Sequence, residues 1–65
     1  MEIDYYFLGL REVINLTGLG KTSIYRYMAK GAFPQNVKLG GRTVAWVSTE
    51  IEQWMQERME ARNKQ

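Results

Sequence analysis

The stretch Gly18–Thr22 reads GLGKT and carries the residue types of a phosphate-binding loop, in which backbone N–H groups and a lysine hold nucleotide phosphates. A Walker-type loop also needs a glycine five positions before Gly20, and that position is Asn15. The dinucleotide pattern Gly-x-Gly-x-x-Gly fails too, because Ser23 stands where the third glycine belongs. A helix-period segment, not a buried strand, precedes the glycines, and a parallel sheet with crossovers does not fit in 65 residues. The glycines therefore indicate the turn of a helix-turn-helix.

A purely basic block in the middle of the chain is the second feature with chemical meaning. Residues 13–49 contain no acidic residue and carry a charge of +5, whereas residues 1–12 carry −2 and residues 50–65 carry −1. The five basic residues are Lys21, Arg26, Lys30, Lys38 and Arg42. A block of one sign is typical of a protein that binds a polyanion, although a solvated basic loop has the same composition.

The composition restricts the other kinds of chemistry. The chain has no Cys and no His, which removes thiolate metal sites, thiol nucleophiles and the commonest general base. We therefore expect no enzyme activity, no metal and no cofactor. No apolar run approaches the roughly 18 residues of a membrane span, and the first residues lack the order of a signal peptide. We expect a cytoplasmic protein that does not contact the membrane.

A helical pattern precedes the glycines over Leu8–Thr17. One face of this helix holds Leu10, Val13, Ile14 and Thr17, at i, i+3, i+4 and i+7. Gly18 ends the pattern, as a glycine just past a helix end does. Leu19 is a single apolar residue in the turn and is expected to fill the gap between two helices.

A second helical pattern follows the glycines, over Lys21–Lys30, and ends at Gly31. Ile24 and Met28, with Tyr25 beside them, predict a buried stripe. The opposite face is polar and basic and contains no carboxylate.

The segment Val37–Trp46 predicts a β-hairpin, because apolar residues alternate with polar ones on both sides of Gly40-Gly41. A two-residue loop of glycines suits a hairpin turn that needs positive φ angles. Such a loop pairs Leu39 with Arg42 and Val37 with Val44.

A final amphipathic helix is predicted from Ser48, as its N-cap, to about Ala61. Its apolar positions are Ile51, Trp54, Met55 and Met59. We interpret Trp46 and Trp54 as an aromatic core pair, and the methionines as core filler. The predicted fold is mainly α with a small β-hairpin, a winged helix-turn-helix forming a single domain over residues 1–65. Residues 1–7 form an extended lead-in and residues 61–65 a frayed tail.

Helix-turn-helix geometry sends the start of the second helix into the major groove of DNA. Arg26 is the best base-reading candidate, because a guanidinium can bond O6 and N7 of guanine together. Thr22 and Ser23 either donate to phosphates and base edges or cap the helix. Arg42, at the hairpin tip, is a candidate for the minor groove, and Tyr27 either contacts DNA or packs. The expected DNA-binding residues are Lys21, Thr22, Ser23, Arg26, Tyr27, Lys30, Lys38 and Arg42.

Residues 8–60 resemble the AlpA-type prophage regulators and related excisionases, small winged-helix proteins akin to the DNA-binding domain of MerR regulators. The pieces that carry the resemblance are Thr17-Gly18-Leu19, Ser23-Ile24-Tyr25-Arg26, Gly31-x-Phe33-Pro34, Val37-Lys38-Leu39-Gly40, and Trp46 followed by Trp54. The chain departs from the family at Gly20, usually Ser, and at Gly41, often Pro.

The resemblance implies a transcriptional regulator of a phage or mobile element, or a recombination directionality factor (excisionase), acting on the DNA of a bacterial host. It also implies an integrase as a candidate protein partner. One such module reads only a short stretch of DNA, so we expect weak homo-association on adjacent sites. The alternative function is a protein-interaction adaptor that uses the apolar face of the final helix.

Overall fold

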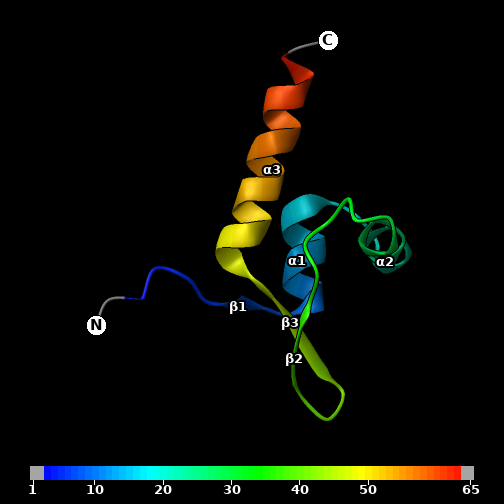
Figure 1. The fold of residues 1–65 in the computed structure, drawn as a ribbon, viewed down its shortest axis with the longest axis vertical. Helices are drawn as coiled ribbons and strands as arrows, with labels where there is room; N and C mark the ends of the chain where they lie inside the picture. Colours follow the sequence, from blue (N-terminus) through cyan, green and yellow to red (C-terminus); the bar gives the residue numbers. More distant parts are fainter. Residues whose placement is uncertain (1–2, 64–65) are drawn as a thin grey trace.

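The computed structural model describes residues 3–63, which form three helices and three short strands. In chain order these are β1 (Phe7–Leu8), α1 (Leu10–Thr17), α2 (Lys21–Ala29), β2 (Val37–Gly40), β3 (Thr43–Val47) and α3 (Ser48–Arg62). Figure 1 shows α1 and α2 on one side of α3, with the β2–β3 hairpin, here called the wing, projecting from the end opposite the C-terminus. The predicted fold class is confirmed: the domain is mainly α with a small sheet, consistent with a winged helix-turn-helix.

The sheet has three antiparallel strands in the order β1-β3-β2, so the predicted hairpin gains a third strand. Leu8 belongs to the third strand, β1, and lies opposite Trp46 of β3. The helix predicted to start at Leu8 therefore starts at Leu10. The physical reason is Gly9, whose extended backbone (φ −75°, ψ 169°) makes it the N-cap of α1. The carboxylate of Glu12 accepts the N–H of Gly9 at 3.0 Å and holds this end of the helix.

The predicted hairpin register is wrong by one residue. Val37 lies opposite Ala45 rather than Val44, and Lys38 lies opposite Val44, with Gly40 paired to Thr43. The ladder is irregular between Lys38 and Gly40, because Gly40 adopts φ +139°, a conformation that only glycine tolerates. The turn then falls one residue later than predicted, and the intervening Leu39 is 47% exposed.

The core lies where the sheet meets the three helices, and Trp46 at its centre has no solvent exposure. The buried cluster comprises Leu8, Val13, Ile24, Phe33, Trp46 and Ile51. Trp46 packs edge-on against Tyr25 and donates its indole N–H to the carbonyl of Pro34 at 3.1 Å. Among the described residues Trp54 contacts a different ring, that of Phe33, so the two tryptophans do not form the predicted aromatic pair.

Helix α3 begins one residue earlier than expected, with Val47 rather than Ser48 in the N-cap position. Ser48 is buried and serves the N-terminal strand instead: its hydroxyl accepts the N–H of Tyr6, and its own N–H donates to the carbonyl of Tyr6, both at 2.8 Å. A long-range pairing has therefore replaced the local cap that the sequence predicted.

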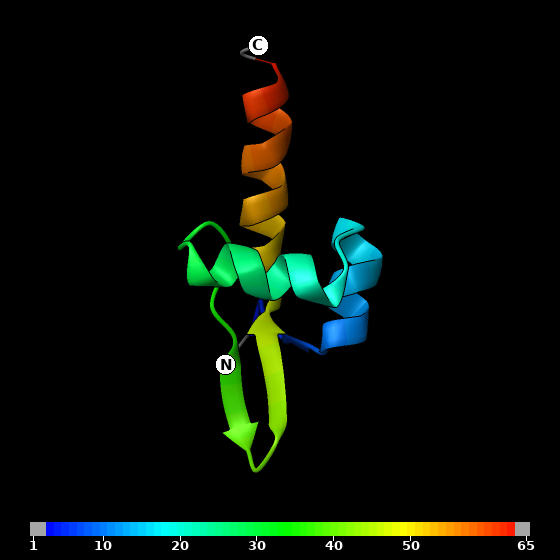
Figure 2. The same cartoon turned by 90° about the vertical axis from the view of Figure 1, so that its right-hand side faces the viewer.

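Only the first half of α3 contributes to the core. Met55 is partly buried, but Met59 is 50% exposed, which corrects its interpretation as core filler. The helix continues past the core toward the C-terminus (Figure 2) and includes residues 61–62 of the predicted tail. Residues 64–65 of that tail and residues 1–2 of the lead-in lie outside the described range.

We expect Trp46→Ala to unfold the domain at 37 °C. Truncating a buried tryptophan costs about 3–5 kcal/mol, and a domain this small has little more than that in total. Thermal denaturation followed by circular dichroism measures the loss. Trp54→Phe is the matched control, because it keeps a ring against Phe33 and should still melt cooperatively. A Trp46→Ala variant that melts within a few degrees of the parent would contradict this assignment of the core.

Candidate nucleic-acid interface

The turn between α1 and α2 is fixed by the side chain of Thr17. Its hydroxyl donates to the carbonyl of Val13 at 2.8 Å and accepts the N–H of Leu19 at 3.2 Å. Gly18 closes α1 in the left-handed conformation, at φ +77°, and donates its N–H to Ile14. Leu19 packs against the core, as predicted. These contacts set the angle at which α2 leaves α1.

The rotation of α2 about its axis is set by Ile24, which has no solvent exposure. With Ile24 directed into the core, the predicted contact residues Lys21, Thr22, Arg26 and Lys30 are exposed, and Ser23 is partly exposed. The N-cap, Gly20, supplies no side-chain cap, so the first N–H groups of α2 retain donor capacity. An uncapped helix start with hydroxyls and cations beside it suits an anion such as a DNA phosphate.

The sequence predicted Tyr25 in the buried stripe of α2 and left Tyr27 open between a DNA contact and packing. Tyr25, expected in the buried stripe, is 37% exposed, and the amide of Asn36 lies 3.5 Å from its hydroxyl. Tyr27, one of the predicted DNA contacts, is partly buried and packs against the core. Tyr25 keeps its edge-on contact with the buried Trp46, and the rest of its side chain is exposed because a residue beside the stripe stands at the margin of the buried face.

The wing supplies the remaining predicted contacts. Lys38 and Arg42 are both exposed, and α2 lies across the domain directly above the wing (Figure 2). The exposed Leu39 stands between them in the chain and adds an apolar group to a basic tip. The sequence had paired Leu39 with Arg42, whereas in the structure Leu39 lies in the irregular part of the ladder between Lys38 and Gly40. The helix and the wing thus present the five basic residues of the acid-free block on adjacent surfaces.

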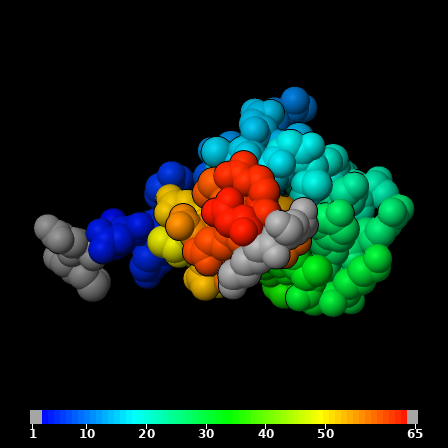
Figure 3. Space-filling view, turned by 90° about the horizontal axis from the view of Figure 1, so that it is seen from above, coloured from blue at the N-terminus to red at the C-terminus, as the bar shows by residue number. Residues whose placement is uncertain are grey.

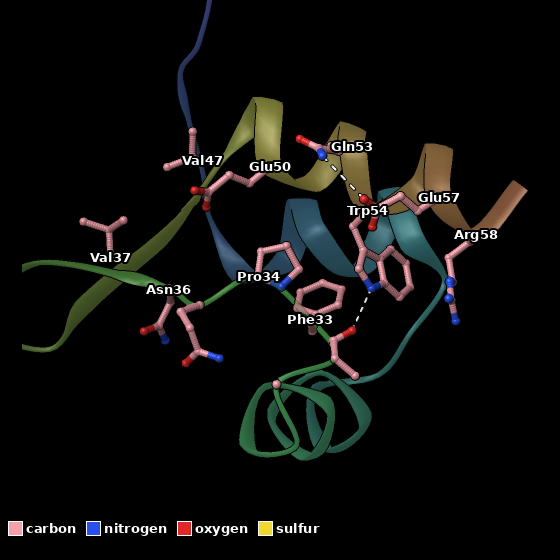
Figure 4. A pocket seen from close by; sticks show the side chains of 13 residues that line it. Phe33, Pro34, Asn36, Val37, Val47, Glu50, Gln53, Trp54, Glu57 and Arg58 are labelled. Atoms are coloured by element: carbon pink, nitrogen blue, oxygen red, sulfur yellow. Dashed lines mark hydrogen bonds between the residues drawn. The ribbon is translucent and has the colours of Figure 1, made fainter. Parts of the chain in front are cut away.

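The loop of residues 30–36, which connects α2 to the wing, is hydrogen-bonded to α2 and to α3. The side-chain amide of Gln35 donates to the carbonyl of Met28 at 2.9 Å, and the indole of Trp54 donates to the carbonyl of Ala32 at 2.8 Å. Between this loop and α3 lies an open hollow of about 790 Å³, floored by Phe33 and Trp54 (Figure 4). The indole N–H of Trp54 is bonded to the loop, so the floor of this hollow joins α3 to the loop between α2 and the wing.

The described residues contain no group of three or more Asp and Glu that could hold a metal ion. No helix in the described range has the length and apolar character that crossing a bilayer requires.

Known proteins match most of this chain. The sequence model of the family described as Prophage CP4-57 regulatory protein (AlpA) matches residues 6–59. Protein ORF88 of Enterobacteria phage P4, described as uncharacterized, is 43% identical over 58 residues, which cover 89% of this chain and 66% of the phage protein. The DNA-binding transcriptional activator AlpA of Escherichia coli (strain K12) is 32% identical over 57 residues, with 78% of this chain and 81% of that protein covered. The chain thus spans just under two thirds of the length of the phage relative.

We expect Gly18→Ala and Gly20→Ser to change stability in opposite directions. Alanine at φ +77° costs about 1–2 kcal/mol, although nothing stands within 4 Å of the added methyl group. Gly20 has φ −81°, and a serine hydroxyl there can cap α2, for a gain of a few tenths of a kcal/mol. Urea denaturation of both variants measures the difference. Equal effects at the two positions would show that Gly18 does not impose the turn.

Proposed function

The chain belongs to the AlpA family of prophage regulatory proteins, and from this premise we propose that it binds double-stranded DNA in a sequence-specific manner. The observation that carries the proposal is the orientation of α2. Burial of Ile24 leaves Lys21, Thr22, Arg26 and Lys30 exposed beside the wing. A reading helix and a wing on adjacent surfaces form the contact surface that a winged helix-turn-helix presents to a duplex.

In this proposal the start of α2 enters the major groove, where Arg26 reads a guanine through its two guanidinium donors. Thr22 and Ser23 contact phosphates or base edges beside the uncapped N–H groups. Lys21, Lys30 and Lys38 neutralise phosphates. Arg42 follows the wing toward the minor groove. Tyr27 acts mainly through packing, which keeps the exposed face of α2 in register with the core.

Two biological roles fit a small regulator of this kind, a transcriptional regulator of a phage or mobile element and a recombination directionality factor. One relative is named a transcriptional activator, which favours the first role. The second role requires an integrase as protein partner, and footprints on an attachment region rather than on a promoter alone would distinguish it. Both roles operate on the DNA of a bacterial host, inside the cell, and both rest on the same interface.

We expect Arg26→Ala to weaken binding to a cognate duplex by about tenfold or more, and binding to a scrambled duplex far less. A base contact carries sequence information, whereas a phosphate contact does not. Titrations of both duplexes at two salt concentrations give the affinities. Lys38→Ala is the matched control, because loss of a phosphate contact weakens both complexes alike and lowers the salt dependence.

An equal loss on both duplexes would show that Arg26 contacts only phosphate. Absence of any salt-dependent DNA binding by the parent protein would favour the adaptor function instead, since an adaptor that uses the apolar side of α3 has no need of the basic surface.

We further expect the protein to be a monomer in solution and to fill adjacent DNA sites cooperatively. A single small module buries about 600–1,000 Å² on DNA, which limits the specificity of one copy, and contacts between copies restore it. Light scattering should give a mass near 7.6 kDa without DNA. Gel shifts on a two-site duplex should show little singly bound complex. A stable dimer in free solution, or independent filling of the two sites, would contradict this expectation.

A further inference from the structure

A short apolar segment leaves the domain before β1. We call residues 3–7 the arm. Four of its five residues are large and apolar or aromatic, and all four are exposed: Ile3 by 65%, Tyr5 by 56%, Tyr6 by 62% and Phe7 by 50%. A contiguous run of this kind is unusual on a soluble monomer and marks an interaction surface.

The direction of the arm is fixed at its base. Both backbone groups of Tyr6 are bonded to Ser48, and Phe7 pairs with Val47 in the sheet. From this anchor the arm runs away on the side of α3 opposite to α1 and α2 (Figures 1 and 3). The arm is therefore presented outward, away from the helices of its own copy.

A second unpartnered apolar surface lies between the end of α1 and α3. This groove, of about 590 Å³, is lined by the apolar side chains of Leu16, Trp54, Met55 and Met59 and by the polar residues Thr17, Glu52, Gln56 and Arg58. Leu16 is 52% exposed and Met59 is 50% exposed, although both belong to regular helices. Methionine side chains adapt their shape to an incoming aromatic ring and make favourable sulfur–aromatic contacts.

We propose that the arm of one copy binds in the groove between α1 and α3 of the copy on the adjacent DNA site. The arm and the groove lie on different sides of the domain, so the contact is head-to-tail and each copy offers one of each. The groove lining holds one cation, Arg58, and one carboxylate, Glu52, so the contact rests on its apolar side chains rather than on net charge. None of these residues belongs to the proposed DNA contacts, so both surfaces stay free on DNA.

The size of the contact explains why the occupant is a neighbouring copy held on DNA. Only about half of each aromatic ring of the arm is still exposed, so the three rings can bury roughly 300–400 Å² of the arm and about 600–800 Å² over both partners, below the roughly 1,200 Å² of a stable complex. Such a contact is too weak to hold two free molecules together. It becomes populated when DNA holds two copies side by side and raises their effective concentration. The inference thus rests on the proposed DNA binding and supplies the physical contact for its cooperativity.

Cross-linking tests the contact directly, because the chain contains no cysteine. One sample carries Tyr5→Cys and a second carries Met59→Cys, and the two are mixed on a two-site duplex under mild oxidation. We expect a disulfide-linked dimer in the mixture, several-fold above a mixture of Tyr5→Cys with Gln53→Cys. Gln53 is the matched control because it is exposed on the side of α3 that lines the other hollow (Figure 4). Equal yields in the two mixtures would overturn the proposal.

Variants test the energetic consequence. Met59→Glu and Tyr5→Ser should each lower the cooperativity on a two-site duplex by about tenfold or more, with single-site affinity unchanged. Gln53→Glu adds the same charge as Met59→Glu and should leave cooperativity intact. The double variant should be no worse than either single one, since both remove one contact. Cooperativity that survives Met59→Glu would overturn the inference and leave the groove to a segment of another protein.

The experiment separates this inference from the proposed function. Binding to a single-site duplex reports the function alone. If that binding is present but cross-linking fails on two sites, the arm contact is wrong and the function stands. If no duplex is bound, the same cysteine pair is oxidised without DNA at high protein concentration. Specific cross-linking there supports the arm contact independently of DNA, and its absence overturns it.

Discussion

The burial of Trp46 is the interaction on which the rest of the domain depends. Its side chain has no solvent exposure. The residue contacts β1, α2 and the loop before the wing. Across the sheet it pairs with Leu8 of β1, its ring meets Tyr25 of α2, and its indole N–H is bonded to Pro34 in the loop before the wing. The described residues form one buried cluster that includes Trp46, so loss of its ring would disturb the packing of both α2 and the wing.

The basic surface is a consequence of this packing combined with local turn chemistry. Ile24 fixes which side of α2 faces outward, and Thr17 with Gly18 fixes the angle of α2 to α1. Gln35 bonds the loop after α2 to the end of α2, and Trp54 bonds the same loop to α3. This loop leads into the wing. The basic residues from Lys21 to Arg42 therefore lie on adjacent surfaces, because the turn before α2 and the loop after it are both held by hydrogen bonds.

Apolar exposure has a different distribution from the basic surface, and the separation has a physical meaning. Five basic side chains lie on α2 and the wing, where Leu39 is also exposed, whereas the arm and the groove beside α3 hold exposed aromatic and methionine side chains. The arm and the groove share no residue with these five basic side chains, so all of these surfaces can be used at once. Helix α3 contributes to both the core and the groove. Ile51 is buried in the core, whereas Met59, two turns later, is half exposed.

The sequence by itself determined the features that depend on local spacing. The helical periods, the glycine-closed turn, the basic face of α2 and the presence of a hairpin were all predicted from neighbouring residues, and so was the exposure of Lys21, Thr22 and Arg26. Only the tertiary structure decided the features that depend on residues far apart in the chain. Leu8 is in a strand because it pairs with Trp46 on β3. Ser48 does not cap α3 but accepts a hydrogen bond from Tyr6, 42 positions away. The register of the wing differs by one residue from the predicted one, because the ladder is irregular at Gly40, whose φ is +139°. The exposure of Met59 followed from the length of α3 relative to the core. A periodic pattern specifies which face of an element is apolar, but the neighbour that covers it is set by packing between distant segments.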